Sequence, residues 1–252
     1  CKQGVNMSVI AQAGAKGRQL HKFGGSSLAD VKCYLRVAGI MADYSQPDDM
    51  MVVSAAGSTT NQLISWLKLS QTDRLSAHQV QQALRRYQSE LISGLLPPEV
   101  ADGLIGAFIH DLERLAGLLD SGVNDAVYAE VVGHGEVWSA RLMSAVLNQQ
   151  GLESAWLDAR DFLRAERGAQ PQVDEGLSYP LLQQLLAQHP GKRLVVTGFI
   201  SRSNAGETVL LGRNGSDYSA TQVGALAGVS RVTIWSDVAG VYSADPRKVK
   251  DA

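Results

Sequence analysis

The segment from Lys22 to Ser27 reads Lys-Phe-Gly-Gly-Ser-Ser and begins inside a short stretch, residues 19–23, that is expected to form a strand. A phosphate group is bound by backbone N–H groups and a nearby cation, and glycine lets the backbone approach it closely. The residue order matches neither the Walker A loop nor the Gly-x-Gly-x-x-Gly dinucleotide fingerprint. Alone, the segment predicts a phosphate cradle about as strongly as it predicts a simple turn between a strand and a helix.

A second group of chemically useful residues lies at 211–220, where the chain reads Leu-Gly-Arg-Asn-Gly-Ser-Asp-Tyr-Ser-Ala. Arg213 could hold a carboxylate through two parallel hydrogen bonds. Asp217 has three open interpretations, because it could cap the helix that follows, orient a lysine ammonium, or bind a metal.

A third group lies at 235–247, which reads Trp-Ser-Asp-Val-Ala-Gly-Val-Tyr-Ser-Ala-Asp-Pro-Arg. An adenine ring could stack on Tyr242, and Arg247 could contact a phosphate. For this segment alone, an ordinary turn rich in Asp, Gly and Pro is the alternative.

Short apolar runs alternate with longer stretches of helical periodicity. We expect strands at 19–23, 49–54, 154–157, 193–197 and 231–236, and a hairpin arm at 208–211. Helices are expected at 28–44, 177–188 and 218–227, several within 60–120, and one over 125–149 that breaks at Gly133-His134-Gly135. Pro98 is placed to open a new helix. The alternation predicts an α/β fold, a three-layer αβα sandwich with a largely parallel central sheet.

Glycine- and serine-rich loops follow four of the expected strands, after residues 23, 53, 197 and 235. The carboxyl ends of parallel strands share one edge of the sheet, and ligands bind at that edge in open α/β folds. Any one of these loops is explained about as well by a simple turn, but the four together indicate an enzyme-like layout.

The 252 residues are 45% hydrophobic and 19% charged, with a net charge of -2 at pH 7. This composition suits a globular α/β chain and shows neither a basic nucleic-acid footprint nor the apolar run of a membrane span. The two cysteines, Cys1 and Cys33, give no disulfide framework and no zinc-ligand pattern. We therefore expect a cytoplasmic protein without nucleic-acid or membrane partners. Residues 1–6 are interpreted as left over from cloning or from upstream reading.

Four motifs follow one another along the chain: Lys-Phe-Gly-Gly-Ser from Lys22, Gly-x-Gly-Glu from Gly133, Gly-Arg-x-Gly-Ser-Asp from Gly212, and Ser-Asp-Val-x-Gly-Val-Tyr-x-x-Asp-Pro-Arg from Ser236. Over residues 19–247 this combination resembles the amino-acid kinase family, and within it the aspartate kinases. The helical stretch at 60–120 is similar to that of the fused aspartate kinase–homoserine dehydrogenases, particularly the enterobacterial methionine-pathway type. The resemblance implies the amino-acid kinase fold, with residues 7–252 as the kinase catalytic domain of a homo-oligomeric full-length parent.

The resemblance also implies an activity. Aspartate kinases transfer the γ-phosphoryl group of ATP, with Mg²⁺, to the side-chain carboxylate of L-aspartate, at the head of the pathway to methionine, threonine and lysine. The attacking carboxylate is already an anion at neutral pH and needs no general base. Catalysis must then come from positioning and from neutralising the charge on the transferring group.

Roles for individual residues follow from the same resemblance. Lys22 is expected to be the main cation on the transferring phosphoryl group, and Asp217 to hold its ammonium. Glu136 is expected to pair with the α-ammonium of aspartate, and Arg213 with its α-carboxylate. The other expected contacts are Gly24, Gly25 and Ser26 with phosphate, Ser54, Phe199 and Ser216 with aspartate, and Ser236, Asp237, Tyr242 and Arg247 with the nucleotide. No protein side chain is expected to bind the metal directly.

His134 lies beside two glycines and is interpreted as a local hydrogen-bonding residue rather than a catalytic one. Family members continue beyond the Asp-Pro-Arg motif, whereas this chain ends at Ala252, so we expect a C-terminally truncated fragment with reduced or absent turnover. Two alternatives stay open. One is an amino-acid kinase that acts on glutamate or acetylglutamate, and the other is a fragment or regulatory module that only binds ligands.

Overall fold

The computed structural model describes residues 7–10, 17–212 and 214–236. Its main sheet has the strand order β1-β8-β2-β3-β5-β4. The parallel strands are β8 (Arg231–Trp235), β2 (Gln19–Phe23), β3 (Met50–Val53), β5 (Arg193–Thr197) and β4 (Ser154–Leu157). One antiparallel strand that the sequence did not predict, β1 (Met7–Ile10), pairs with β8 at the edge. The expected largely parallel sheet is confirmed.

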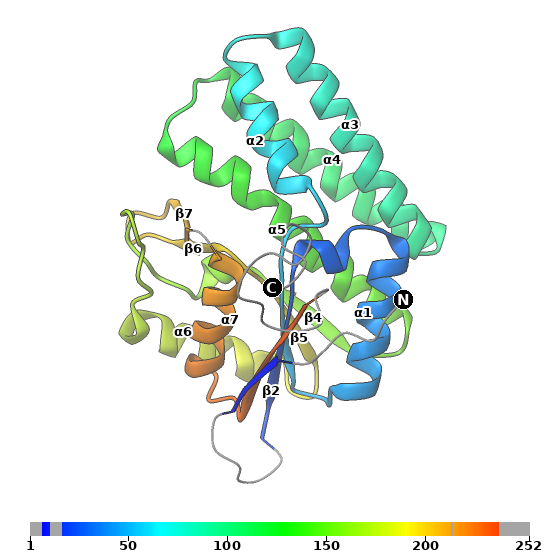
Figure 1. Ribbon diagram of the computed structural model, residues 1–252, viewed down its shortest axis with the longest axis vertical. Coiled ribbons are helices and arrows are strands. Elements are labelled where there is room, and N and C mark those ends of the chain that lie inside the picture. The colour runs from blue at the N-terminus through cyan, green and yellow to red at the C-terminus, as the bar shows by residue number, and fades with distance from the viewer. Residues whose placement is uncertain (1–6, 11–16, 213, 237–252) are drawn as a thin grey trace, which may run out of the picture.

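Helices cover both faces of this sheet (Figure 1). One face carries α1 (Val31–Tyr44) and α5 (Asp125–Gln149), and the other carries α6 (Glu175–Gln188) and α7 (Gly215–Leu226). Alternate residues of β3 enter the two cores, since Met51 belongs to the first and Met50 to the second. Side chains of a strand point alternately to its two faces, so burial on both sides requires an uninterrupted apolar strand. The predicted three-layer αβα architecture is confirmed.

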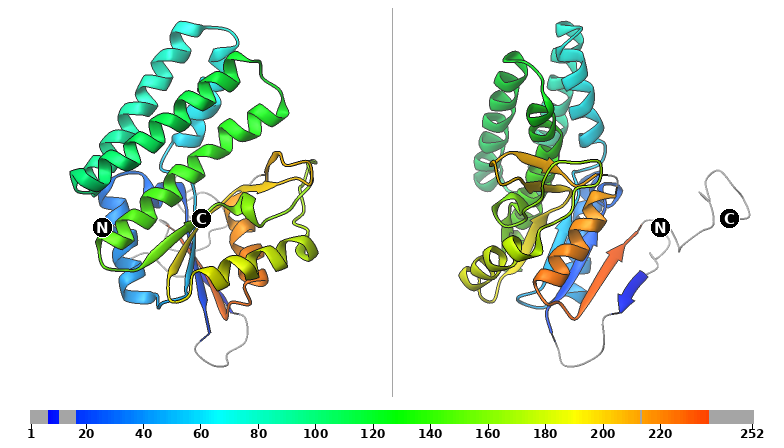
Figure 2. Two further views of the ribbon diagram at one scale, coloured as in Figure 1. Left: turned by 180° about the vertical axis from the view of Figure 1, so that it is seen from behind. Right: turned by 90° about the vertical axis from the view of Figure 1, so that its left-hand side faces the viewer.

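Three further helices rise above the carboxyl edge of the sheet (Figures 1 and 2). These are α2 (Thr59–Ser70), α3 (Arg74–Leu95) and α4 (Pro98–Asp120), and we call them the helical lobe. Pro98 lies in the first turn of α4, as predicted, where its missing N–H costs nothing. The lobe therefore sits over the edge at which the loops after β2, β3 and β5 leave the strands.

Smaller elements complete the fold. The strands β6 (Ile200–Arg202) and β7 (Thr208–Leu210) pair as an antiparallel hairpin, which contains the predicted arm. Two short 3-10 helices, η1 (Gly25–Leu28) and η2 (Ala159–Asp161), follow β2 and β4.

Two helix predictions were wrong in detail. The first helix begins at Val31 rather than at 28, because Asp30 caps it by accepting a hydrogen bond from the Cys33 N–H at 2.8 Å. The predicted break in α5 is absent, and the helix runs unbroken through Gly133 and Gly135. A Cβ on Gly133 would lie 2.5 Å from Ile200 Cγ2, so glycine here lets β6 approach the helix.

Gly135 lies against the loop after β3, and replacing it tests the close packing of α5. An added Cβ would lie 2.9 Å from the Ala55 Cβ and 3.0 Å from the Thr59 Cγ2. We expect Gly135→Ala to lower the free energy of unfolding by about 1–3 kcal/mol, because both neighbours are buried and cannot move aside cheaply. Urea denaturation measures this loss.

The matched control is Gly117→Ala on α4. A Cβ at this position would meet no described atom within 4 Å. Alanine is the better helix former, so we expect the free energy of unfolding to rise by about 0.5–1 kcal/mol. Equal effects of the two substitutions would contradict the packing role of Gly135.

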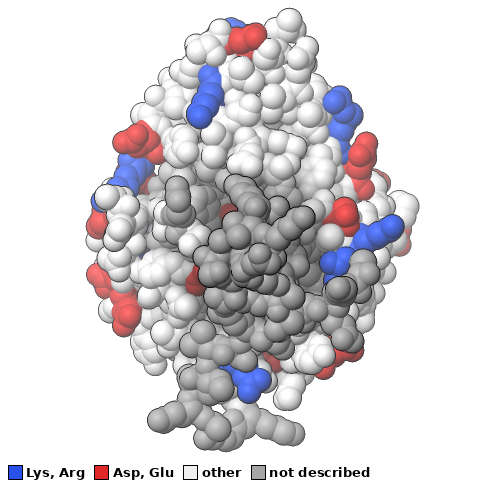
Figure 3. Space-filling model, in the orientation of Figure 1, with Lys and Arg blue, Asp and Glu red and all other residues white. Residues whose placement is uncertain are grey.

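Charged side chains are dispersed around one face of the molecule. On the face shown in Figure 3, acidic and basic groups lie around the rim, often beside one another. Among the helices that the structure describes, none is long and apolar enough to cross a lipid bilayer.

Candidate active site

An ion pair joins two residues that are far apart in the sequence. Lys22 is the penultimate residue of β2, and its Nζ lies 2.6 Å from Oδ1 of Asp217 in the first turn of α7. The helix is capped at Asn214, which has a left-handed φ of 59°. Of the three interpretations of Asp217, the ion pair favours the one in which its carboxylate orients the Lys22 ammonium. The lysine side chain is only 11% exposed, so its charge is concentrated at the carboxyl edge of the sheet.

The predicted phosphate residues begin directly after Phe23, where β2 ends. Gly24 precedes the 3-10 helix that Gly25 opens, and Ser26 is exposed. A Cβ on Gly24 would lie 3.6 Å from the Lys22 Nζ, so the ammonium sits close to this backbone. A Cβ on Gly25 would lie 2.7 Å from the Ala55 carbonyl oxygen. Glycine is therefore required at position 25 by the neighbouring loop.

Glu136 on α5 is a buried acid beside this pair. It is 3% exposed, and its Oε2 finds no hydrogen-bond partner among the described residues. Burial raises the pKa of Glu136 well above the ordinary carboxyl value, against the opposing effects of Lys22 and of a hydrogen bond from the Ala55 backbone. An unpaired carboxyl oxygen in such a place is suited to receive a ligand cation.

The two predicted serines meet at the same edge. The hydroxyl of Ser54, which follows β3, donates to the hydroxyl oxygen of Ser216 at 3.0 Å. A Cβ on Gly198 would lie 2.9 Å from the Ser216 Cβ, so the loop after β5 also reaches this point. Residues from three loops are thereby brought together, as the shared carboxyl edge predicted.

Phe199 adopts a backbone conformation that side chains rarely adopt, with a φ of 66°. Its N–H donates to the Ser219 hydroxyl at 2.9 Å, and a Cβ on Gly215 would lie 2.5 Å from its ring. Strained residues of this kind persist where the surroundings fix them, often at functional sites. Phe199 is held over the start of α7, close to Ser216.

The structure thus brings together the predicted residues Lys22, Gly24, Gly25, Ser54, Glu136, Phe199, Ser216 and Asp217. Ser236 follows β8, the strand beside β2. The predicted residues Arg213, Asp237, Tyr242 and Arg247 lie outside the described residues. Sequence reasoning missed the Ala55 backbone and the Ser219 hydroxyl. The run of small residues after Val53 indicated the Ala55 backbone, but nothing in the sequence indicated the Ser219 hydroxyl.

Residues 17–252 match the model of the family described as "Amino acid kinase family". The chain belongs to the amino acid kinase family. The bifunctional aspartokinase/homoserine dehydrogenase 2 of Escherichia coli is 92% identical over 98% of this chain and 30% of that protein. Lysine-sensitive aspartokinase 3 of Escherichia coli is 33% identical over 92% of the chain and 51% of that protein.

Solved structures of amino acid kinases agree with these relatives. The structure of E. coli aspartokinase III in complex with aspartate and ADP has a TM-score of 0.82 and 29% identity, and covers 92% of this chain and 52% of that one. The predicted resemblance to aspartate kinases and their fold is confirmed. The chain spans about a third of the bifunctional relative and about half of aspartokinase 3.

In this amino acid kinase chain, His134 belongs to a polar network on α5. Its Nε2 lies 3.4 Å from Asp111 Oδ2 on α4, and its Nδ1 lies 3.6 Å from Glu130 Oε1. Burial opposes the charge of Asp111, but hydrogen bonds and charge from His134 and Arg141 outweigh it and lower the pKa of Asp111 to about 2. A hydrogen bond of 3.4 Å between Arg114 Nη2 and His134 Nδ1 fits the interpretation of His134 as a local hydrogen-bonding residue. Glu130 Oε2 also accepts a hydrogen bond from Arg160 Nη1 at 2.7 Å, which connects α5 to the segment after β4.

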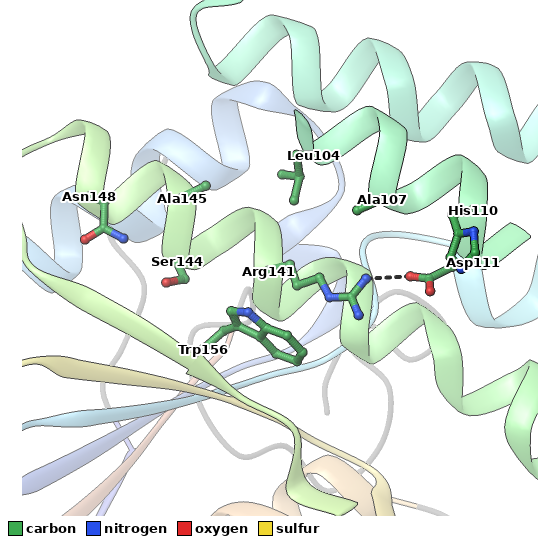
Figure 4. Close-up of a pocket in the computed structure, with 9 residues that line it drawn as sticks. All are labelled: Leu104, Ala107, His110, Asp111, Arg141, Ser144, Ala145, Asn148 and Trp156. Atoms are coloured by element: carbon green, nitrogen blue, oxygen red, sulfur yellow. Dashed lines mark hydrogen bonds and ion pairs between the residues drawn. The ribbon is translucent and has the colours of Figure 1, made fainter. Parts of the chain in front are cut away.

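A hollow of about 540 Å³ between α4, α5 and β4 contains none of the predicted site residues (Figure 4). Arg141 crosses it, bonded to Asp111 at 2.5 Å and stacked on Trp156 at 4.8 Å from the ring centre. Ser144 and Asn148, which also line it, are bonded to Ser154. Because these polar groups are already paired, the hollow offers a ligand little specific recognition.

Among the described residues, no group of three or more His, Cys, Asp or Glu side chains could hold a metal ion.

Proposed function

We propose that this chain carries aspartate kinase activity, the transfer of the γ-phosphoryl group of ATP to the side-chain carboxylate of L-aspartate to give 4-phospho-L-aspartate and ADP. The observation that carries the proposal is the buried carboxyl of Glu136, whose Oε2 has no hydrogen-bond partner among the described residues, beside the Lys22–Asp217 ion pair. The Glu136 carboxyl suits the ammonium of an amino acid, and the Lys22 ammonium suits a phosphoryl group. The 92% identical bifunctional aspartokinase/homoserine dehydrogenase 2 supports the same activity. The proposal places this activity at the head of the pathway to methionine, threonine and lysine.

The side chains at the site fit a transfer that needs no general base. The attacking carboxylate of aspartate is an anion at neutral pH, and charge builds up on the transferring group. In the proposal Lys22 neutralises that charge, and Asp217 keeps its ammonium in place at 2.6 Å. Mg²⁺ would enter with ATP, bound mainly by the phosphates as is usual for this ion.

The remaining predicted contacts complete the proposal. Glu136 would pair with the α-ammonium of aspartate, and Ser54 and Ser216 would lie beside its carboxylates. Phe199 would cover the substrate from the loop after β5. Arg213 is proposed to hold the α-carboxylate, and Ser236, Asp237, Tyr242 and Arg247 to line the nucleotide site. The proposal also places the protein in the cytoplasm, as the two cysteines favour, and makes the full-length protein a homo-oligomer.

Comparing three ligands by thermal shift tests the substrate. L-aspartate at a hundred times its dissociation constant should stabilise the chain by about 2.7 kcal/mol, which corresponds to roughly 5–10 °C in Tm. L-glutamate is one methylene longer, and N-acetyl-L-glutamate lacks the ammonium that Glu136 would pair with, so both should give smaller shifts. Differential scanning fluorimetry with and without Mg-ATP measures all three.

The same comparison separates the alternatives. Stabilisation by L-glutamate or N-acetyl-L-glutamate but not by L-aspartate would assign the chain to another amino acid kinase activity. Stabilisation by L-aspartate without any aspartate-dependent release of ADP from Mg-ATP would favour the module that only binds ligands.

A further inference from the structure

Two active-site loops are tied to each other through their backbones. We call residues 24–29 the phosphate loop and residues 54–58 the serine loop. The Gly57 N–H donates to the Gly25 carbonyl at 3.0 Å, and the Ser54 N–H donates to the Phe23 carbonyl at 3.1 Å. A Cβ on Gly25 would lie 2.7 Å from the Ala55 carbonyl oxygen. Since the two loops are in contact, a displacement of one must displace the other.

Helix α3 of the helical lobe reaches the serine loop through Gln88. This residue is 2% exposed, and its Nε2 donates to the Thr59 hydroxyl at 2.9 Å. The Thr59 hydroxyl in turn donates to the Ala56 carbonyl at 2.6 Å. Because Thr59 accepts one bond and donates the other, the direction of its hydroxyl is fixed. The relay ends next to Ala55, whose backbone holds Glu136.

The neighbouring residue on α3 reaches the phosphate loop. The Tyr87 hydroxyl donates to the Ala29 carbonyl at 2.9 Å. It also fills the space beside Gly57, where a Cβ would lie 2.8 Å from the Tyr87 hydroxyl. Gly57 has a φ of 52°, so its loop turns sharply at the point of contact.

We propose that Tyr87 and Gln88 are positioning residues that set the phosphate loop and the serine loop from the helical lobe. That these two loops hold aspartate and phosphate rests on the proposed function. Gln88 is the polar member of the buried residues of α3, a helix that the structure describes in full, and the others are Ala77, Leu84, Leu91 and Ile92. An apolar side chain would fill the space equally well, whereas the amide directs the Thr59 hydroxyl onto Ala56. The lobe thereby holds both loops in one arrangement relative to Lys22 and Glu136.

The test combines Tyr87→Phe and Gln88→Met in the whole chain. Each change keeps the size of the side chain and removes its hydrogen bond. Hydrogen exchange by mass spectrometry should show peptides that cover residues 24–29 and 54–58 exchanging about three- to tenfold faster, as expected for the loss of one or two net hydrogen bonds. The dissociation constant for L-aspartate, from calorimetry, should rise by a similar factor. Tyr87→Phe alone should give smaller increases in loop exchange and in the dissociation constant for L-aspartate. This single variant replaces the double variant in the test if the double variant does not fold.

Gln183→Met is the matched control, because the Gln183 amide donates to the Leu226 carbonyl at 2.9 Å on the opposite side of the sheet. It should leave the loop peptides and aspartate affinity unchanged. Thr59→Ser keeps the hydroxyl and should preserve slow exchange of the serine loop, whereas the isosteric Thr59→Val should not. Unchanged loop exchange in the double variant overturns the positioning role. A wild-type chain that shows no affinity for aspartate would instead overturn the proposed function, and the exchange result would still decide the role of α3.

Discussion

Glu136→Gln will weaken L-aspartate binding by on the order of 10²-fold or more while making the folded chain more stable at neutral pH. The affinity falls because a neutral amide replaces the partner of a buried ammonium. The stability rises because the wild-type carboxyl must either be ionised in a buried place, where Oε2 has no hydrogen-bond partner among the described residues, or take up a proton when the chain folds. Calorimetric titration and urea denaturation of both proteins measure the two effects.

The direction in which the free energy of unfolding changes with pH follows from the raised pKa of Glu136. Burial raises the pKa of Glu136 in the folded chain above its value in the unfolded chain. Between these two values the folded state holds the proton more tightly, so wild-type stability falls as the pH rises through this range. Glu136→Gln has no carboxyl at this position, so its stability does not fall in this way. Its advantage should therefore be largest well above the raised pKa and should disappear below about pH 4.5, the ordinary value of the carboxyl.

Binding should show the same linkage. The ammonium of aspartate selects the ionised form of Glu136, so aspartate affinity should fall as the pH drops through the raised pKa. Titration in buffers of different ionisation enthalpy should show proton release by the wild type and none from this position in Glu136→Gln. Glu113→Gln, at an exposed position on α4, is the control and should change neither affinity nor stability. A variant that is less stable than the wild type at neutral pH would refute the buried-charge argument.

In the full-length protein, Lys22→Met should reduce aspartate-dependent ADP release by about 10³-fold or more, the usual effect of removing a cation from a transferring phosphoryl group. The affinity for Mg-ATP should fall as well. The fold should remain, because Asp217 is 43% exposed and an ion pair of this kind contributes at most about 1 kcal/mol. A coupled assay for ADP and a thermal melt separate the two effects.

Lys68→Met is the matched control, since Lys68 is exposed near the end of α2. It removes the same charge without touching the carboxyl edge of the sheet, and it should leave turnover unchanged. Turnover of Lys22→Met within a few fold of the wild type would remove Lys22 from the proposed chemistry.

Much of the fold could be predicted from the sequence because its strands are short, apolar and buried on both faces. β2 and β5 have the predicted bounds, and all five residues of β5 are buried. The glycines of α5 misled the prediction. Gly133 and Gly135 are typical of a helix break when read locally, but here they let β6 and the serine loop approach an intact helix.

The candidate site was predicted as a set of residue types, and the structure adds what depends on packing. The raised pKa of Glu136 follows from its burial, which no local pattern shows. Gln88 lies 29 positions from Thr59, and a glutamine on an amphipathic helix usually faces water. Its role could not be predicted from the sequence because the partner is fixed only by the way the helical lobe folds back.

Four consecutive residues of α5 face four different parts of the molecule. Gly133 faces β6, His134 faces α4, Gly135 faces the serine loop, and Glu136 faces the active site. Successive residues of a helix are turned by about 100°, so these directions form one fixed set. Inserting a single residue ahead of Gly133 would rotate the set by that angle and misplace every partner at once. Changes in chain length should therefore be tolerated at the ends of α5 and nowhere along its middle.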